Sequence, residues 1–108
     1  MRRIFTYGGY FEKFIESLSD DVVKKIDYVI SLLKTQERLS EKFVKYVEDG
    51  IYELRIHYEG CVYRIFFIFD NGNIVVLFNG FKKKSQKTPK KEIEMARTIK
   101  NAYYETRK

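Results

Sequence analysis

The sequence is poor in several residue types that mark particular classes of protein: it has one cysteine, one proline, one histidine and no tryptophan. A single cysteine, Cys61, excludes an intrachain disulfide and a zinc site built from four cysteines. No stretch approaches the roughly 18 apolar residues of a membrane-spanning helix, and the residues after Met1 lack the apolar run of a signal peptide. We therefore expect a cytoplasmic protein that does not enter a membrane.

Apolar and aromatic residues are plentiful, at 44% and 17% of the chain, with nine tyrosines and nine phenylalanines. This is enough to bury a core, and the length suits one domain, which we expect to span residues 1–108. The net charge of +6 is concentrated, because six lysines and no acid lie between Lys82 and Lys91 while the rest of the chain is balanced. A local cationic segment on a neutral body indicates an anionic partner at one place.

The hydrophobic pattern predicts an α+β fold in the order β-α-α-β-β-β-α, with an antiparallel sheet and the helices packed mainly on one face. Thr88 and Pro89 are typical of the N-cap and first position of the last helix. Residues 36–50 have no clear pattern and stay unassigned. The predicted elements are a strand at 3–7, helices at 10–18 and 21–35, strands at 51–58, 62–69 and 74–81, and a final helix that starts at Pro89.

Two turn dipeptides, Glu59-Gly60 and Asn71-Gly72, separate the three predicted strands and favour two-residue hairpin turns. Counting outward from such turns places Arg55 opposite Arg64 and Arg64 opposite Asn79, all on one face. Glu53, His57, Val62, Phe66, Ile68 and Leu77 share this mixed face. The other face is predicted to be apolar and covered by helices: Tyr52, Leu54, Ile56, Tyr58, Tyr63, Ile65, Phe67, Phe69, Ile74, Val76 and Phe78.

Two arginines directly opposite each other destabilise a sheet unless a negative group neutralises them. The sequence leaves two candidates for that group, a structural ion pair with Glu53 and a bound phosphate. On the repulsion alone, removing Arg64 is expected to leave the stability unchanged or improved. Glu53 and His57 are also candidate acid–base groups, although nearby arginines should depress the pKa of Glu53 and make it a poor base.

The lysine run has two interpretations as well. It is either a solvated charged loop or an anion-binding segment at the start of the last helix, where free N–H groups already favour an anion. Lys87, Lys90 and Lys91 flank this helix start, where cations are otherwise disfavoured. The run begins three residues after Asn79, so the arginines and the lysines are expected at the same end of the sheet.

The stretch "GIYELRIHYEGCVYRIFFIF" followed by "VVLFNGFKKKSQKTPKKEIEMA" resembles the RelE/ParE toxin superfamily, most closely its HigB-like, phage-associated branch. A "YELR" strand, a "YRI" strand and an "F-x-KK-[ST]-Q-K-T-P" segment occur there in this order. The match covers the C-terminal half by motif and the helical N-terminal half by layout only. The resemblance implies a RelE-like fold.

The same resemblance implies the toxin of a type II toxin–antitoxin system, usually a ribosome-dependent mRNA endoribonuclease that needs no metal or cofactor. Its partners would be mRNA, the ribosome and a cognate antitoxin of helix-turn-helix type, with which it would form a hetero-oligomer. Alternatives are a ParE-like DNA gyrase poison and a non-catalytic basic RNA- or DNA-binding module. The motifs assign catalytic positions to Arg55, Arg64, Lys83 and Lys84, and RNA contacts are expected from Lys82, Lys87, Lys90, Lys91 and Asn79.

Overall fold

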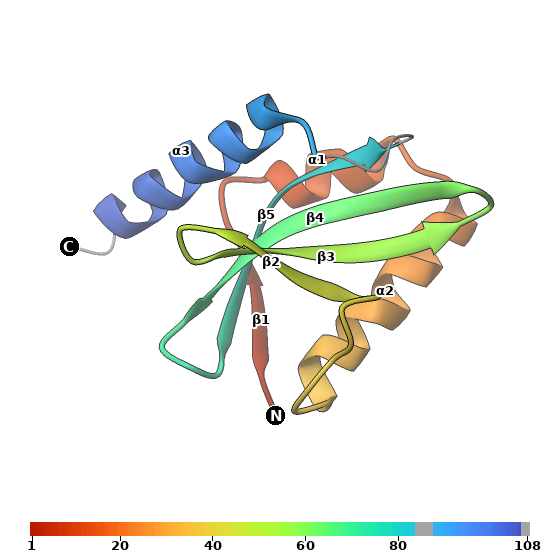
Figure 1. Cartoon of the computed structure of the whole chain (residues 1–108), viewed down its shortest axis with the longest axis horizontal. Helices are drawn as coiled ribbons and strands as arrows, with labels where there is room; N and C mark the ends of the chain where they lie inside the picture. The colour runs from red at the N-terminus through yellow and green to blue at the C-terminus, as the bar shows by residue number, and fades with distance from the viewer. Residues whose placement is uncertain (84–87, 107–108) are drawn as a thin grey trace.

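The computed structural model describes residues 1–83 and 88–106, which form five strands and three helices (Figure 1). The predicted α+β class and most element positions are confirmed. The unassigned region 36–50 contains an additional short strand. The elements are β1 (Arg3–Thr6), α1 (Tyr10–Glu16), α2 (Asp20–Thr35), β2 (Val44–Glu48), β3 (Ile51–Tyr58), β4 (Cys61–Asp70), β5 (Ile74–Lys83) and α3 (Lys90–Thr106).

The strands form one sheet in the order β1-β5-β4-β3-β2. The predicted antiparallel meander is confirmed and extends over β2, β3, β4 and β5. β1 joins its far edge and runs parallel to β5, with Arg3 opposite Ile74 and Thr6 opposite Leu77. The sheet is therefore mixed. Helices α1 and α2 follow β1 and carry the chain across one face of the sheet before the meander begins.

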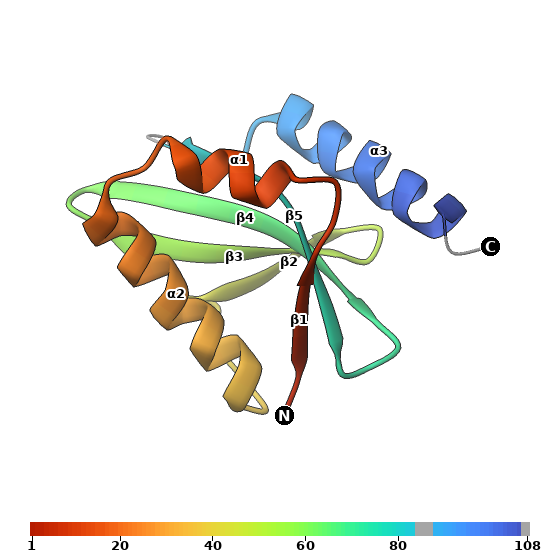
Figure 2. The ribbon, with the colours of Figure 1, turned by 180° about the vertical axis from the view of Figure 1, so that it is seen from behind.

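Helices α1 and α2 cover one face of the sheet, as predicted, whereas α3 covers the opposite face (Figures 1 and 2). Ser19 caps α2 by accepting a hydrogen bond from the backbone N–H of Val22 at 3.4 Å. α3 begins at Lys90, one residue later than predicted, and its first turn is closed by Ile93 N–H donating to Pro89 O at 3.4 Å. No helix among the described residues is long and apolar enough to cross a membrane.

The first hairpin has the predicted register. Glu59 and Gly60, with φ of 47° and 79°, form a two-residue turn that pairs Tyr58 with Cys61. Eight residue pairs connect β3 and β4, and Arg55 lies opposite Arg64. The local turn therefore set the register of this arginine pair, because no β-bulge shifts the pairing of β3 with β4 between the turn and the arginines.

The second hairpin differs from the prediction. Its loop has three residues, 71–73, because Asp70 pairs with Ile74 and not with Asn73. The extra residue turns the first half of β5 over, so that Leu77 faces α1 and α2, the opposite of its predicted face. Ile74, Val76 and Phe78, predicted beneath these helices, lie on the α3 face instead.

A β-bulge then shifts the register again between Leu77 and Gly80, where two residues of β5 oppose the single residue Phe66 of β4. Arg64 consequently lies opposite Phe81, and the predicted pairing of Arg64 with Asn79 is wrong. Gly80 follows the bulge beneath Phe14 of α1. A Cβ atom at Gly80 would lie 2.4 Å from the Phe14 ring, so this close approach of helix and strand requires glycine.

Candidate functional site

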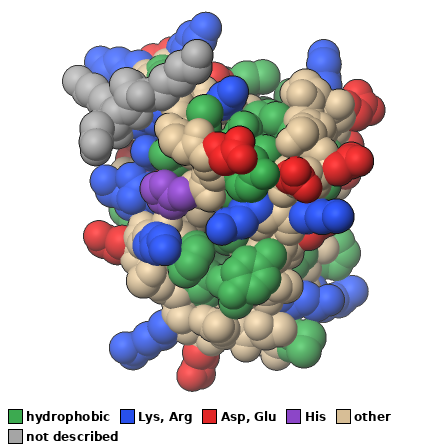
Figure 3. All heavy atoms as spheres, turned by 90° about the vertical axis from the view of Figure 1, so that its right-hand side faces the viewer, with side chains coloured by type: hydrophobic (Ala, Val, Ile, Leu, Met, Phe, Trp, Pro, Cys, Tyr) green, Lys and Arg blue, Asp and Glu red, His purple; other side chains and the backbone are tan. Residues whose placement is uncertain are grey.

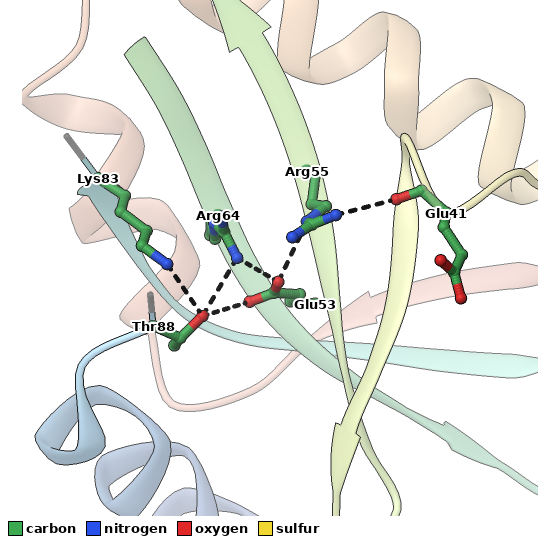
Figure 4. Close-up of polar contacts among 6 residues, drawn as sticks. All are labelled: Glu41, Glu53, Arg55, Arg64, Lys83 and Thr88. Atoms are coloured by element: carbon green, nitrogen blue, oxygen red, sulfur yellow. Dashed lines mark hydrogen bonds and ion pairs between the residues drawn. The ribbon is translucent and has the colours of Figure 1, made fainter. Parts of the chain in front are cut away.

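A cluster of five polar side chains lies on the α3 face of the sheet, beside the start of α3 (Figure 4). Three adjacent strands supply four of them, and the fifth lies just before α3. Because Arg55 is paired with Arg64, and Lys83 is paired with the residue two before Arg64, all three cations project from one face. The cluster consists of Glu53 and Arg55 of β3, Arg64 of β4, Lys83 of β5, and Thr88.

Glu53 is the centre of this cluster. Its Oε1 accepts a hydrogen bond from Arg64 NH1 and another from Arg55 Nε at 3.2 Å. Glu53 is 1% exposed and Arg64 4% exposed, so their ion pair is shielded from water. The structural ion pair left open by the sequence is therefore present, and one buried carboxylate pairs with both arginines and offsets part of their charge.

Thr88 joins the start of α3 to the cluster. Its hydroxyl donates to Glu53 Oε2 at 3.3 Å, and it accepts from Arg64 NH1 at 3.1 Å and from Lys83 Nζ at 3.4 Å. The sequence pattern predicted Thr88 only as a helix cap and did not predict its hydrogen bonds to the cluster. Its position in the "Q-K-T-P" part of the motif, which also carries lysines, could have indicated this role.

Arg55 is the most accessible cation of the cluster, with 20% of its side chain exposed. Its NH1 group donates to Glu41 O at 3.2 Å, and its backbone N–H donates to Phe43 O at 2.7 Å. These bonds hold the segment before β2 against β3. Arg64, in contrast, is buried, and its Nε has no hydrogen-bond partner among the described residues. The cluster therefore presents one cation at the surface and keeps two beneath it.

The electrostatics of the cluster act most strongly on Lys83. Burial, reinforced by the charges of Arg64 and Arg55, lowers the pKa of Lys83 to about 8, against the opposing effect of Glu53. A lysine with this pKa is neutral in an appreciable fraction of molecules near neutral pH. Burial also lowers the pKa of Arg64, which Glu53 opposes. Lys83 therefore has the properties of a proton-transfer group, and the arginines those of permanent cations.

His57 lies outside this cluster. It is exposed near the end of β3 and lines a small cavity of about 260 Å³ with Lys25 and Tyr28 of α2 and Lys42 of the loop before β2. Burial, followed by the charges of Arg55, Lys42 and Arg64, lowers the pKa of His57. Figure 3 shows the histidine in purple at the surface, with Lys and Arg side chains around it.

The other predicted residues are dispersed. Lys82 projects from the opposite face to Lys83, and its ammonium lies 5.8 Å from the centre of the Tyr63 ring. Lys90 and Lys91 are exposed on the first turn of α3. Asn79 is buried at the bulge and donates to Glu92 O at 3.5 Å. Lys84 and Lys87 lie outside the described residues.

Comparison with known protein families matches residues 13–101 to the family described as phage-derived protein Gp49-like (DUF891). The chain belongs to the Gp49-like family. This is a toxin-like, RelE-like family in general, and the match includes every member of the Glu53 cluster. No curated protein matches the Gp49-like chain. Among its described residues, no three His, Cys, Asp or Glu side chains are grouped so that they would hold a metal ion.

Proposed function

We propose that this Gp49-like chain is the toxin of a type II toxin–antitoxin pair, of the HigB-like branch of the RelE/ParE superfamily, and that it cleaves mRNA on the ribosome in the cytoplasm. The observation that carries the proposal is the cluster of Arg55, Arg64 and Lys83 around Glu53 and Thr88. Guanidinium groups that bind a carboxylate suit a phosphate equally well, because both anions accept from a planar fork of donors. The toxin-like character of the family supports the same proposal.

RNA can be cleaved by attack of a 2′-hydroxyl on the adjacent phosphorus, with negative charge building up on the phosphate oxygens. In this proposal Arg55, the accessible cation, receives the phosphate first. Arg64 then donates to the oxygens as their charge grows. Both arginines keep their charge throughout, so the stabilisation does not depend on a proton transfer.

Lys83 is the proposed proton-transfer group. In its neutral form the amine takes the proton of the 2′-hydroxyl while the oxygen–phosphorus bond forms. The bond from phosphorus to the 5′-oxygen breaks, and that oxygen takes a proton from the ammonium just formed or from water. The products are a 2′,3′-cyclic phosphate and a 5′-hydroxyl. The pKa of about 8 suits this role, because an effective base is partly neutral at the operating pH.

Substrate binding requires an exchange of partners within the cluster. Arg64 and Lys83 are buried and both donate to the Thr88 hydroxyl, so they reach a phosphate only by replacing these bonds. Thr88 precedes α3 and is partly buried, which makes it the member most easily displaced. The ribosome would hold the message in position and so supply the orientation that a small site lacks.

The proposal is tested by inducing the protein alone in bacteria and mapping transcript 5′ ends within minutes. We expect cuts inside translated regions, with 5′-hydroxyl ends, and these cuts should disappear when translation initiation is blocked. DNA breaks without RNA cuts would assign the chain to the ParE-like gyrase poisons instead. Growth arrest with neither RNA cuts nor DNA breaks would indicate a non-catalytic basic binding module and contradict the nuclease proposal.

A matched pair of lysine variants makes the test specific to the cluster. Lys83→Met removes the proposed base, and Lys24→Met removes an exposed lysine of α2. Loss of a general base typically costs about 10²- to 10⁴-fold in rate. We expect a loss of this size in single-turnover cleavage for Lys83→Met and none for Lys24→Met. Equal rates for the two variants would contradict the assignment of Lys83.

A further inference from the structure

A cavity of about 260 Å³ lies beside the end of β3, between α2 and the segment that precedes β2. Its lining consists of Lys25, Tyr28 and Val29 from α2, Lys42 and Phe43 from that segment, and His57 from β3. Three of these six side chains are basic and none is acidic. In Figure 3, Lys and Arg side chains lie around the histidine. The cavity therefore attracts an anion and repels a metal cation.

The walls of the cavity are held in place by the fold. On α2, Lys25 and Tyr28 lie within about one turn of Val29, which is fully buried and anchors this side of the helix in the core. On the other side, Phe43 O accepts the backbone N–H of Arg55 at 2.7 Å, which fixes the segment before β2 against β3. A cavity that is formed before the ligand arrives binds it at a smaller entropic cost.

Aromatic rings form a second part of the lining. Tyr28 is 56% exposed although it is a large aromatic residue, and Phe43 is half-buried. The Lys42 ammonium lies 5.6 Å from the centre of the Phe43 ring. The volume of about 260 Å³ is several times the ~30 Å³ that one water molecule occupies in the liquid, so it has room for a ring as well as an anionic group. Nucleobases stack on exposed aromatic rings of this kind.

The charges near His57 give the cavity a positive potential. Burial lowers the pKa of His57, and the charges of Arg55 and Lys42 lower it further. Arg64 acts in the same direction, and Lys25 lines the same cavity. An anion among these groups relieves their repulsion and favours the protonated ring. His57 follows Arg55 by two residues on the same side of β3, so the cavity adjoins the accessible cation of the cluster.

The two parts of the lining together distinguish among possible ligands. A carboxylate of a protein or an inorganic phosphate would bind the lysines and leave the aromatic rings in water. An apolar ligand would contact the rings and leave the cations unpaired. A nucleotide uses both parts, because it joins a phosphate to a flat base.

We propose that this cavity binds one nucleotide unit, either a free nucleotide or one within an RNA strand. Lys25 and Lys42 donate to its phosphate together with the protonated ring of His57. The base stacks on Tyr28. Binding here requires no bond cleavage, so the proposal is independent of the nuclease. RNA cuts without nucleotide binding at this cavity would refute this inference alone, and nucleotide binding without RNA cuts would refute the nuclease alone.

His57 is the only histidine of the chain, so the NMR signals of its ring report on the cavity without ambiguity. The full chain is titrated with adenosine 5′-monophosphate, adenosine, inorganic phosphate, glutamate and a tetra-adenylate RNA. We expect the monophosphate to shift the ring signals and to raise the pKa of His57, because an anion favours the charged ring. Adenosine, phosphate and glutamate should each bind at least about tenfold more weakly, since each makes only part of the contacts.

The tetra-adenylate identifies the source of the nucleotide. Tighter binding of this RNA than of the monophosphate would assign the cavity to an RNA strand. Tighter binding of the monophosphate would assign it to a free nucleotide.

A matched pair of lysine variants tests the cavity itself. Lys25→Met removes a lining ammonium and should raise the Kd of the monophosphate by about tenfold. Lys24→Met removes the same charge from the neighbouring exposed position of α2 and should leave the Kd unchanged. Tyr28→Ala should raise the Kd of the monophosphate by about tenfold and leave that of inorganic phosphate unchanged, because only the base meets the ring. All three positions are exposed, so thermal unfolding should match the wild type.

Three results would each overturn the proposal. His57 signals that change with neither the monophosphate nor the tetra-adenylate would show that no nucleotide enters the cavity. Equal losses of affinity for Lys24→Met and Lys25→Met would show a general attraction to the net charge of +6. Glutamate or inorganic phosphate that binds as tightly as the monophosphate would show an anion site in which the base makes no contact.

Discussion

Glu53 turns a repulsive pair of arginines into a bonded cluster, because its carboxylate accepts hydrogen bonds from both. Two arginines face each other across β3 and β4, which in isolation is repulsive. The buried Glu53 carboxylate accepts from both and from Thr88, so that the pair becomes part of a hydrogen-bonded network. Removing one member leaves the others buried and incompletely paired, and this cost exceeds the relief of repulsion.

Arg64→Ala is therefore expected to destabilise the protein, contrary to the expectation from the sequence. Breaking a buried ion pair typically costs about 3–5 kcal/mol, and the lower end applies because Glu53 retains Arg55 and Thr88. Urea unfolding of the variant measures the loss. Arg97, which is partly exposed and pairs with Glu48 and Asp49, is the control, and its change to alanine should lower the stability far less. A stability for Arg64→Ala equal to that of the wild type would refute this account.

The lowered pKa of Lys83 predicts that the stability of the protein depends on pH in a specific way. Its pKa is about 8 in the folded protein against 10.5 for an unperturbed lysine, so between these values the unfolded chain binds more protons. The free energy of unfolding should therefore receive a contribution from Lys83 that increases as pH rises from about 8 to 10.5. Unfolding measured across this window for the wild type and Lys83→Met isolates the contribution, because other groups titrate in both. Parallel curves for the two proteins would contradict the lowered pKa.

At the scale of elements, β5 is the strand that assembles the molecule. It contacts β1 on one side and β4 on the other, lies beneath α1, and ends with Lys83 in the cluster. A three-residue loop and a bulge each shift its register, and the two shifts together return its last residues to the face of Arg64. Without the bulge, Lys83 would project from the other face of the sheet.

Gly80→Ala tests the close packing of this strand against α1. The added Cβ would lie 2.4 Å from the Phe14 ring, and such overpacking typically costs about 1–3 kcal/mol. Phe14→Ala alone should also destabilise by opening a cavity. In the double variant the new methyl group meets no ring, so the two effects should be less than additive. A double-mutant cycle by urea unfolding gives the coupling; strictly additive values would mean that Phe14 does not restrict Gly80.

The whole molecule combines a balanced body with a cationic segment at the end of the sheet that holds the cluster. Lys83, within this segment, is buried, whereas Lys82, Lys90 and Lys91 are exposed and able to contact a phosphate backbone. We propose that Lys90 and Lys91, on the first turn of α3, bind the RNA backbone, and that the buried groups act on the RNA. Binding and cleavage should then respond differently to salt and to substitution.

Lys90→Ala is expected to weaken binding to single-stranded RNA and to lower the slope of log affinity against log salt by about 0.7, as for one lost phosphate contact. Single-turnover cleavage at saturating ribosomes should change little, because the cluster is intact. Fluorescence anisotropy over a salt series measures the slope. Lys24→Ala, at an exposed position of α2, is the control and should keep the wild-type slope. The same slope for both variants would show that Lys90 makes no such contact.

The sequence by itself determined the α+β class, helix α2, strand β3 and the Arg55–Arg64 pair. These features depend on local periodicity and on one two-residue turn, so each is encoded within a short stretch. The resemblance to RelE-like toxins was likewise carried by short motifs, and the family match supports it in general terms. Neither required knowledge of how distant segments meet.

The tertiary structure alone decided how β5 is placed, where β1 and β2 pair, and which residues surround Glu53. Asn71-Gly72 is compatible with a two-residue or a three-residue loop, and the choice depends on which face of β5 the helices can bury. Thr88 reaches Glu53 across 35 residues of sequence. Its partner was fixed by α3 packing on the sheet, a long-range contact that no local pattern of residues encodes.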